Sequence, residues 1–100
     1  MAPTADLAAL KLGDFSPHLD GVFEMLTAGG TIPLKLAKAD PAGQSGRAGG
    51  AFSLVFVAPA GPWQPQATYP VEHPALGTME IFLVPVGPLQ GGNGYQAVFA

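Results

Sequence analysis

The chain contains no cysteine among its 100 residues. A disulfide framework, a thiolate nucleophile and a zinc site with thiolate ligands are therefore excluded. The two histidines, His18 and His73, form neither a paired metal-ligand spacing nor a helical i, i+4 set with carboxylates. Because a zinc or iron site needs three or four convergent ligands, we expect no metal and no other cofactor.

Charged residues are scarce as well. They make up 11% of the chain, against about a quarter in an average globular protein, whereas hydrophobic residues make up 48%. Only four residues are basic and the formal net charge is -3, so the chain has no electrostatic footprint for a phosphate backbone. We expect no nucleic-acid partner. We do expect part of the apolar surface to be covered by a protein partner or by a second copy of the chain.

No long hydrophobic run is present. The longest apolar stretch, residues 51–60, is interrupted by Ser53 and Pro59 and is too short to span a membrane. The N-terminus lacks the basic start and the apolar core of a signal peptide. We therefore expect a protein without membrane contact or secretion signal, located in the cytoplasm or incorporated in an assembled particle.

Motifs of nucleophilic catalysis and phosphate binding are also missing. Residues 43–47, Gly-Gln-Ser-Gly-Arg, lack the final glycine of a G-x-S-x-G nucleophile elbow. No glycine-rich segment has the spacing G-x-G-x-x-G or is followed by Lys-Ser or Lys-Thr. The sequence thus predicts a protein that is not an enzyme.

What the chain does contain is a series of short strand-like segments. Residues 67–72 and 78–86 are rich in β-branched and aromatic residues and flank His-Pro-Ala-Leu-Gly at residues 73–77, which predicts a β-hairpin. Further strands are expected over residues 22–27, 31–39, 52–57 and 95–99, and loops or turns over residues 40–50, 59–65 and 87–94. The short connections favour a mainly β fold, a single small antiparallel barrel or sandwich of about six strands.

A short helical segment is expected before the strands. Thr4 can cap a helix over residues 5–12 that Gly13 would end, and Ser16-Pro17 predicts another turn over residues 17–19, anchored by Phe15 and Leu19. A chain of this length forms one domain. We expect residues 1–19 to be a helical lid that plugs an open end or covers a face, and residues 22–100 to be the sheet.

Apolar residues on the outer face of the expected strands are the main functional signal. The period of two places Phe82 and Val84 opposite the core residues of their strand, and Val55 and Val57 opposite those of theirs. If the core leaves these four side chains outside, they form a patch suited to self-association or docking. The alternative is that the helix covers them. We predict a non-catalytic structural or interaction module that forms a homo-oligomer or docks to a larger assembly.

A second hypothesis is a small-ligand or glycan-binding barrel. Trp63, Tyr69 and His73 would lie at its mouth, where the Trp63 indole offers a rigid apolar face with one hydrogen-bond donor. The alternative for Trp63 is a loop anchor that lies on the barrel mouth.

A third hypothesis, an enzyme, would make His73 a general base beside Glu72 or Glu80. However, neighbouring side chains of a strand point to opposite faces, so Glu72 is not automatically directed toward His73. Glu80 is expected to form an ordinary cross-strand polar pair. Because His73 precedes Pro74 at the hairpin corner, we predict a hydrogen-bonding role in the turn.

Four segments together resemble a family of short bacterial proteins of unknown function. They are Phe-Ser-Leu-Val-Phe at residues 52–56, Gln-Ala-Thr-Tyr-Pro-Val-Glu-His-Pro-Ala-Leu-Gly at 66–77, Glu-Ile-Phe-Leu-Val-Pro-Val at 80–86 and Tyr-Gln-Ala-Val-Phe at 95–99. The likeness extends to residues 15–23. It implies no catalytic residue. It does imply an accessory role beside phage-tail-collar-like proteins and therefore favours a function in assembly.

Overall fold

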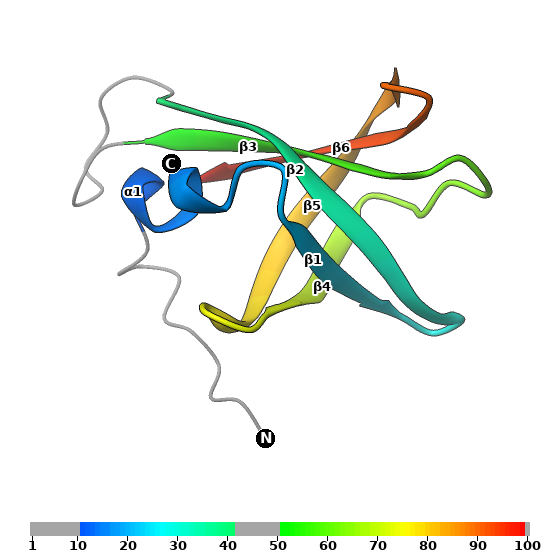
Figure 1. Ribbon diagram of the computed structural model, residues 1–100. Coiled ribbons are helices and arrows are strands. Elements are labelled where there is room, and N and C mark those ends of the chain that lie inside the picture. Colours follow the sequence, from blue (N-terminus) through cyan, green and yellow to red (C-terminus); the bar gives the residue numbers. More distant parts are fainter. Residues whose placement is uncertain (1–10, 42–50, 100) are drawn as a thin grey trace.

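Six strands account for the alternating apolar segments of the sequence. The computed structural model describes residues 11–41 and 51–99. Its strands are β1 (Val22–Thr27), β2 (Gly30–Pro41), β3 (Phe52–Pro59), β4 (Ala67–His73), β5 (Gly77–Leu89) and β6 (Gly92–Phe99). They form a closed antiparallel barrel in the order β1-β2-β3-β6-β5-β4 (Figure 1). The predicted mainly β fold is confirmed, and of the two predicted architectures the chain adopts the barrel.

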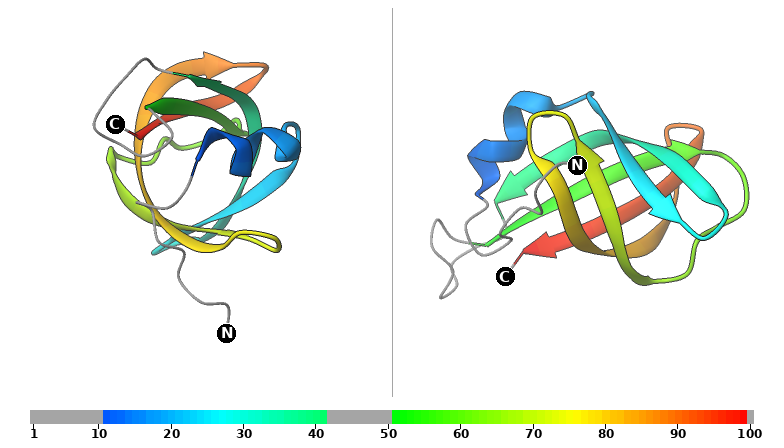
Figure 2. Two further views of the ribbon diagram at one scale, coloured as in Figure 1. Left: turned by 90° about the vertical axis from the view of Figure 1, so that its left-hand side faces the viewer. Right: turned by 90° about the horizontal axis from the view of Figure 1, so that it is seen from below.

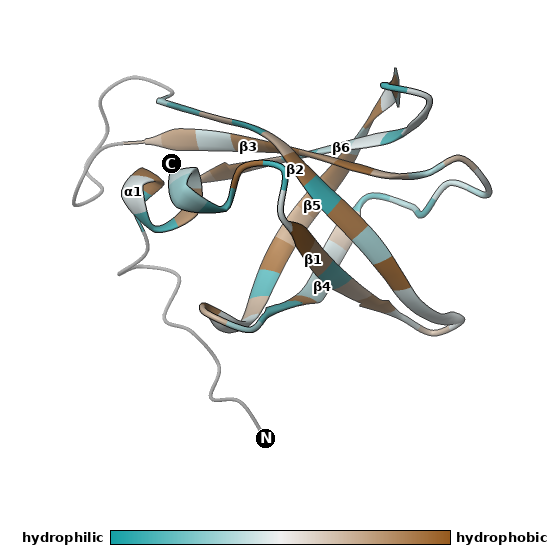
Figure 3. Ribbon diagram, in the orientation of Figure 1, coloured by the Kyte–Doolittle hydropathy of each residue, from teal (hydrophilic) through white to brown (hydrophobic). Residues whose placement is uncertain are grey.

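The hydrophobic core fills the inside of the barrel. Along β3, Phe52, Leu54 and Phe56 point inward and are 0–1% exposed, whereas Val55 and Val57 point outward and are half-buried. Along β2, apolar and polar residues alternate, as Figure 3 shows. Complete burial of a side chain of this size stabilises the fold by about 1.5–3 kcal/mol relative to exposure. The other strands supply Phe23, Met25, Leu34, Leu36, Val71, Met79, Ile81, Leu83, Tyr95, Ala97 and Phe99.

One end of the barrel is closed by two short helical segments, α1 (Leu12–Phe15) and η2 (Ser16–His18). The Phe15 side chain is fully buried there, and its ring centroid lies 5.7 Å from that of Phe52 and 5.8 Å from that of Phe99. The right view of Figure 2 shows both segments at this end of the barrel. Among the described residues, no helix is long and apolar enough to cross a membrane.

The predicted helix boundaries are wrong where the structure describes them. The helix expected over residues 5–12 lies outside the described residues except for Lys11, which is extended, and Leu12, which begins α1. Gly13, the expected end, lies within α1. The reason is Asp14, whose carboxylate accepts a hydrogen bond of 2.8 Å from the Lys11 N–H and so starts the helix there. The expected anchor Leu19 is 45% exposed, because η2 ends before it.

The turn expected over residues 87–94 is also wrong, because the two last strands are longer than their apolar pattern suggests. They are joined only by Gln90 and Gly91, whose φ values of 49° and 79° are both in the left-handed region, as in a tight type I′ hairpin turn. The neighbouring glycines serve close packing. A Cβ at Gly92 would lie 2.1 Å from the Ala58 carbonyl oxygen, and a Cβ at Gly94 would lie 2.5 Å from Leu89 Cδ1.

Two β-bulges interrupt the regular register. Between β2 and β3 the register shifts between Leu36 and Lys38, so Ala37 is the additional residue. Between β5 and β6 it shifts between Pro85 and Gly87, so Val86 is the additional residue. Bulges bend a strand and redirect its side chains. Both lie on strands that flank the β3–β6 pair, and they shape the surface outside that pair.

Candidate functional site

The strongest candidate for an interaction site is the outside of β3, β6 and the part of β5 from Phe82 onward. We call the six residues Val55, Val57, Phe82, Val84, Val86 and Val98 the apolar face. Phe82 is 50% exposed, Val86 46% and Val98 61%, and the other three are half-buried. After Arg47, the sequence contains no Asp, Glu, Lys or Arg apart from Glu72 and Glu80. The six residues themselves are uncharged, and charged side chains border them: Glu80 lies two residues before Phe82 on the same side of β5, and Lys35 and Lys38 of β2 pair with Val57 and Val55.

The ladder registers place these residues side by side. Gln96 of β6 pairs with Val55 on one side and with Val84 on the other, which makes a row across three strands. Val98 pairs with Ser53 of β3, and Phe82 pairs with Thr68 of β4. The predicted interaction residues Val55, Val57, Phe82 and Val84 thus all lie on the outer surface. The described helical residues lie at the barrel end, where Phe15 enters the core, and leave the apolar face open (Figure 2).

A groove of about 370 Å³ runs along one side of the apolar face. The bulge residues Ala37 and Val86 line it from β2 and β5, and Val55 and Gln96 line it from the two strands between. Of the described residues that line the groove, Lys38 alone is charged. The two bulge residues therefore border a shallow depression whose lining combines apolar side chains with Lys38, Gln90 and Gln96.

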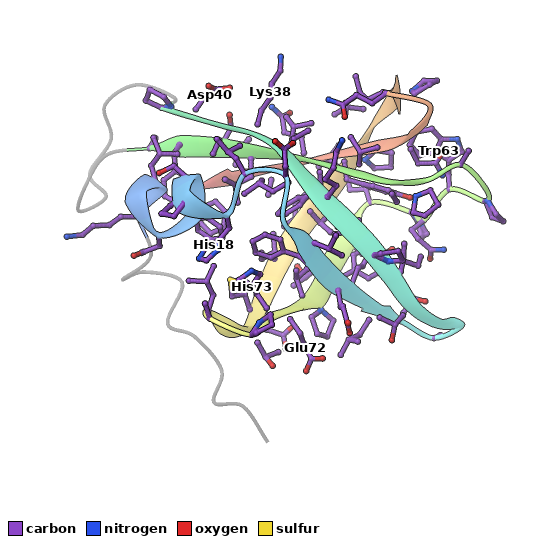
Figure 4. All side chains as sticks on the ribbon, in the orientation of Figure 1. His18, Lys38, Asp40, Trp63, Glu72 and His73 are labelled. Atoms are coloured by element: carbon purple, nitrogen blue, oxygen red, sulfur yellow. The ribbon has the colours of Figure 1, made fainter. Side chains whose placement is uncertain are left out.

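His73 lies at the end of the barrel that α1 and η2 close. Its ring centroid is 4.3 Å from that of His18 in η2 and 4.4 Å from that of Phe23, and Figure 4 shows the two histidines together. Its Nδ1 accepts a hydrogen bond of 3.0 Å from the Ala75 N–H, so the predicted role in the turn is confirmed. Burial, with a smaller contribution from His18, lowers the pKa of His73.

The carboxylates of Glu72 and Glu80, which were candidates to orient His73, have other neighbours. Glu72 Oε2 accepts a hydrogen bond of 3.2 Å from the Thr78 hydroxyl, and Glu24 of β1 pairs directly with Glu72 in the ladder. Glu80 lies opposite Pro70. Glu24, Glu72 and His73 line one surface hollow of about 390 Å³, but within the described residues no carboxylate forms a hydrogen bond with His73. The geometry of a general base with its orienting carboxylate is therefore not assembled in the described part of the chain.

The opposite end of the barrel carries Trp63 and Tyr69. Trp63 is 43% exposed, and its ring centroid lies 5.7 Å from that of Tyr95. The Tyr69 hydroxyl donates a hydrogen bond to the Pro65 carbonyl, while burial and Tyr95 raise the pKa of Tyr69. Tyr69 and His73 lie toward opposite ends of β4, and Figure 4 shows Trp63 far from His73. The structure thus brings Trp63 and Tyr69 to one loop and separates both from His73.

Comparison with known proteins identifies the family. Residues 10–99 match the model of the domain of unknown function DUF6916. The chain belongs to this family. The match includes all six strands and both helical segments of the DUF6916 barrel. No curated protein and no solved structure matches the chain. The predicted membership of a family of unknown function is confirmed, and the family description assigns no activity.

Sequence reasoning missed two side chains of the Trp63 end of this DUF6916 domain. Asn93 and Tyr95 point inward on β6, together with Ala97 and Phe99. Tyr95 Oη accepts a hydrogen bond of 2.9 Å from the Gln64 N–H, and Asn93 Nδ2 donates one of 3.0 Å to the Gly61 carbonyl. The signal for Asn93 in the sequence is that it is a polar residue at an even spacing from the inward-pointing residues Tyr95, Ala97 and Phe99 of the last strand. Sequence reasoning missed it because residues 92–94 were predicted to be part of a turn, whereas they belong to β6.

Proposed function

We propose that this DUF6916 domain is a non-catalytic protein-interaction module that binds through its apolar face. The observation that carries the proposal is the combination of exposed Phe82, Val86 and Val98 with the two neighbouring strands β3 and β6, which contain no charged residue. Monomeric proteins rarely expose large contiguous apolar patches, because transfer of such surface out of water is favourable. A partner that covers this face would gain that free energy, while the charged groups of Lys35, Lys38 and Glu80 lie at its border.

A second copy of the chain is the partner that the charge distribution favours. In the strand order of the closed barrel, the β1–β4 pair lies across the ring from the β3–β6 pair. Glu24 and Glu72 are on β1 and β4. Two chains with a net charge of -3 each can therefore join their apolar faces while these two carboxylates point away from the interface, and Lys35, Lys38 and Glu80 at its border include both signs of charge. Closed homo-oligomers with self-complementary interfaces are the commonest soluble assemblies.

The resemblance to proteins that accompany phage-tail-collar-like proteins supports the same kind of role. Phage tails are particles that consist of repeated subunits. A small barrel with one uncharged face is suited to a repeated position in a particle of this type, with the face docked on a neighbouring subunit.

The test is to measure the oligomeric state by sedimentation equilibrium over a wide concentration range. We expect the wild-type chain to associate and Phe82→Asp or Val98→Asp to weaken association at least about tenfold, because each places a charge in the apolar face. Val22→Asp is the matched control. Val22 is 55% exposed, close to the 61% of Val98, but lies on β1 across the barrel. It should leave association unchanged.

Salt gives a second readout. An apolar interface between two chains of net charge -3 should associate at least as well at high as at low ionic strength, because salt screens their repulsion, whereas an ionic interface would weaken. A wild-type chain that stays monomeric at the highest attainable concentration would contradict self-association. Equal weakening by Val98→Asp and Val22→Asp would show that the apolar face is not the interface.

A further inference from the structure

A cavity of about 240 Å³ opens at the Trp63 end of the barrel. It lies between Ile32 and Pro33 of β2, the end of β3 at Ala58, and the loop that connects β3 to β4. Asn93 and Tyr95 line it from β6. None of the described residues that line it is charged. Its volume is below the about 300–1,000 Å³ of typical small-molecule sites, so it suits one small uncharged group.

Asn93 supplies an unmatched acceptor. It is 6% exposed and, besides Tyr95, is the one described residue with a buried polar side-chain group. Its Nδ2 donates a hydrogen bond of 3.0 Å to the Gly61 carbonyl and approaches the Pro62 carbonyl at 3.5 Å, which fixes the amide orientation. No donor within residues 11–41 and 51–99 reaches Asn93 Oδ1. A buried acceptor needs a donor, and beside this cavity the donor is either water or a ligand group, so a ligand N–H that enters the cavity can take the place of water.

Tyr95 supplies an unmatched donor. The residue is 1% exposed, and its hydroxyl oxygen accepts the hydrogen bond from the Gln64 N–H. The hydroxyl proton has no acceptor in the described part of the chain. Asn93 and Tyr95 are two residues apart and point to the same side of β6, which separates their Cα atoms by roughly 6.8 Å. A ligand amide presents its N–H and its C=O in opposite directions and can meet one group with each.

We propose that this cavity binds the acetamido group of an N-acetylated sugar. The amide N–H donates to Asn93 Oδ1, the Tyr95 hydroxyl donates to the amide carbonyl, and the methyl group packs against Pro33, Pro59 and Pro62. Trp63, which follows Pro62 and lies against Tyr95, offers its exposed ring to the apolar face of the sugar. This site is separate from the apolar face and goes beyond the proposed interaction function.

The experiment compares N-acetylglucosamine with glucose, which has the same ring with a hydroxyl in place of the acetamido group. We expect N-acetylglucosamine to bind and glucose not to. In saturation-transfer NMR the acetyl methyl protons should receive the strongest signal, because they lie deepest in the cavity. Trp63 is the single tryptophan of the chain, so its fluorescence gives an independent titration.

Variants locate the site. Trp63→Ala, at a partly exposed position, and Tyr95→Phe, which removes only the hydroxyl group, should each weaken binding about tenfold. Val98→Asp, on the apolar face, should leave sugar binding unchanged even if it abolishes association, so the two proposals fail separately. The sugar comparison on the wild-type chain remains decisive if Tyr95→Phe is poorly folded. Equal binding of both sugars, or no binding of N-acetylglucosamine at millimolar concentration, would overturn the proposal.

Discussion

His73 occupies an environment that favours its neutral form. Its ring packs against those of Phe23 and His18, and its Nδ1 accepts the hydrogen bond from the Ala75 N–H, which needs an unprotonated nitrogen. Burial and the neighbouring His18 both lower the pKa of His73. Glu24 and Glu72, which line the same hollow, would favour the protonated form but do not reverse this direction. The corner of the β4–β5 hairpin therefore contacts η2, which together with α1 forms what we call the helical plug, through the titratable residue His73.

The first prediction concerns the pH dependence of stability. In the unfolded chain His73 has its ordinary pKa of 6.5, and folding lowers it. The unfolded state then binds the proton first, so the stabilisation from neutral His73 is complete above pH 6.5 and is lost as the pH falls through the lower folded-state pKa. We expect the Tm of the wild-type chain to fall in this window.

His73→Asn is the matched variant for this measurement. An asparagine oxygen can accept the same turn hydrogen bond from the Ala75 N–H, but it does not titrate. The Tm of this variant should therefore depend less on pH below 6.5 than that of the wild type. If both chains lose stability with the same slope, protonation of His73 is not the cause.

At the scale of the secondary-structure elements, the plug depends on one side chain. Phe15 is fully buried against Phe52 and Phe99, whereas Leu19, which follows η2, is 45% exposed. We expect Phe15→Ala to lower the free energy of unfolding by about 3–5 kcal/mol, because it leaves a cavity at the barrel end. Leu19→Ala should change it by less than about 0.5 kcal/mol. Urea denaturation measures both. Similar effects of the two substitutions would show that the plug is not part of the core.

The strands differ in how far their sequence predicts them. Alternation of apolar and polar residues gave the limits of β1 correctly, because its ends coincide with glycine-containing turns. The same reasoning shortened β5 and β6, because Gly92 and Gly94 look like turn residues although they are required by close packing between strands. The start of α1 depends on one hydrogen bond from the Lys11 N–H to Asp14, which no periodicity reveals.

The two candidate sites also differ in how far the sequence predicts them. The outward position of Val55, Val57, Phe82 and Val84 follows from the period of two within single strands, so the sequence predicts it. The Trp63 end does not follow from local pattern. Its hydrogen bonds join Gln64 to Tyr95 and Gly61 to Asn93, residues about thirty positions apart whose proximity is set by barrel closure. The separation of Trp63 from His73 has the same origin, since each lies at a different end of the barrel.

At the scale of the whole molecule, the barrel is closed by its shortest ladder, the pairing of β1 with β4, which we call the seam. β1 and β4 are joined by the pairs Glu24–Glu72 and Met25–Val71, whereas the other neighbouring strands share longer ladders. Closure removes the unpaired strand edges that would otherwise template pairing with another chain. One of the two pairs in this seam sets two carboxylates directly opposite each other, and like charges in this position are destabilising.

Removal of one of these charges should therefore stabilise the barrel. Glu24→Gln leaves the hydrogen bond between Glu72 and Thr78 intact, and we expect it to raise the free energy of unfolding by about 0.2–1 kcal/mol at low salt, with a smaller gain at high salt. Glu80→Gln is the control, because Glu80 lies opposite Pro70 and meets Glu72 only diagonally. Amide exchange along β1 and β4 should slow in Glu24→Gln, since opening of the seam becomes rarer. A Glu24→Gln chain that is less stable than the wild type, or no different from Glu80→Gln, would show that repulsion across the seam does not limit closure.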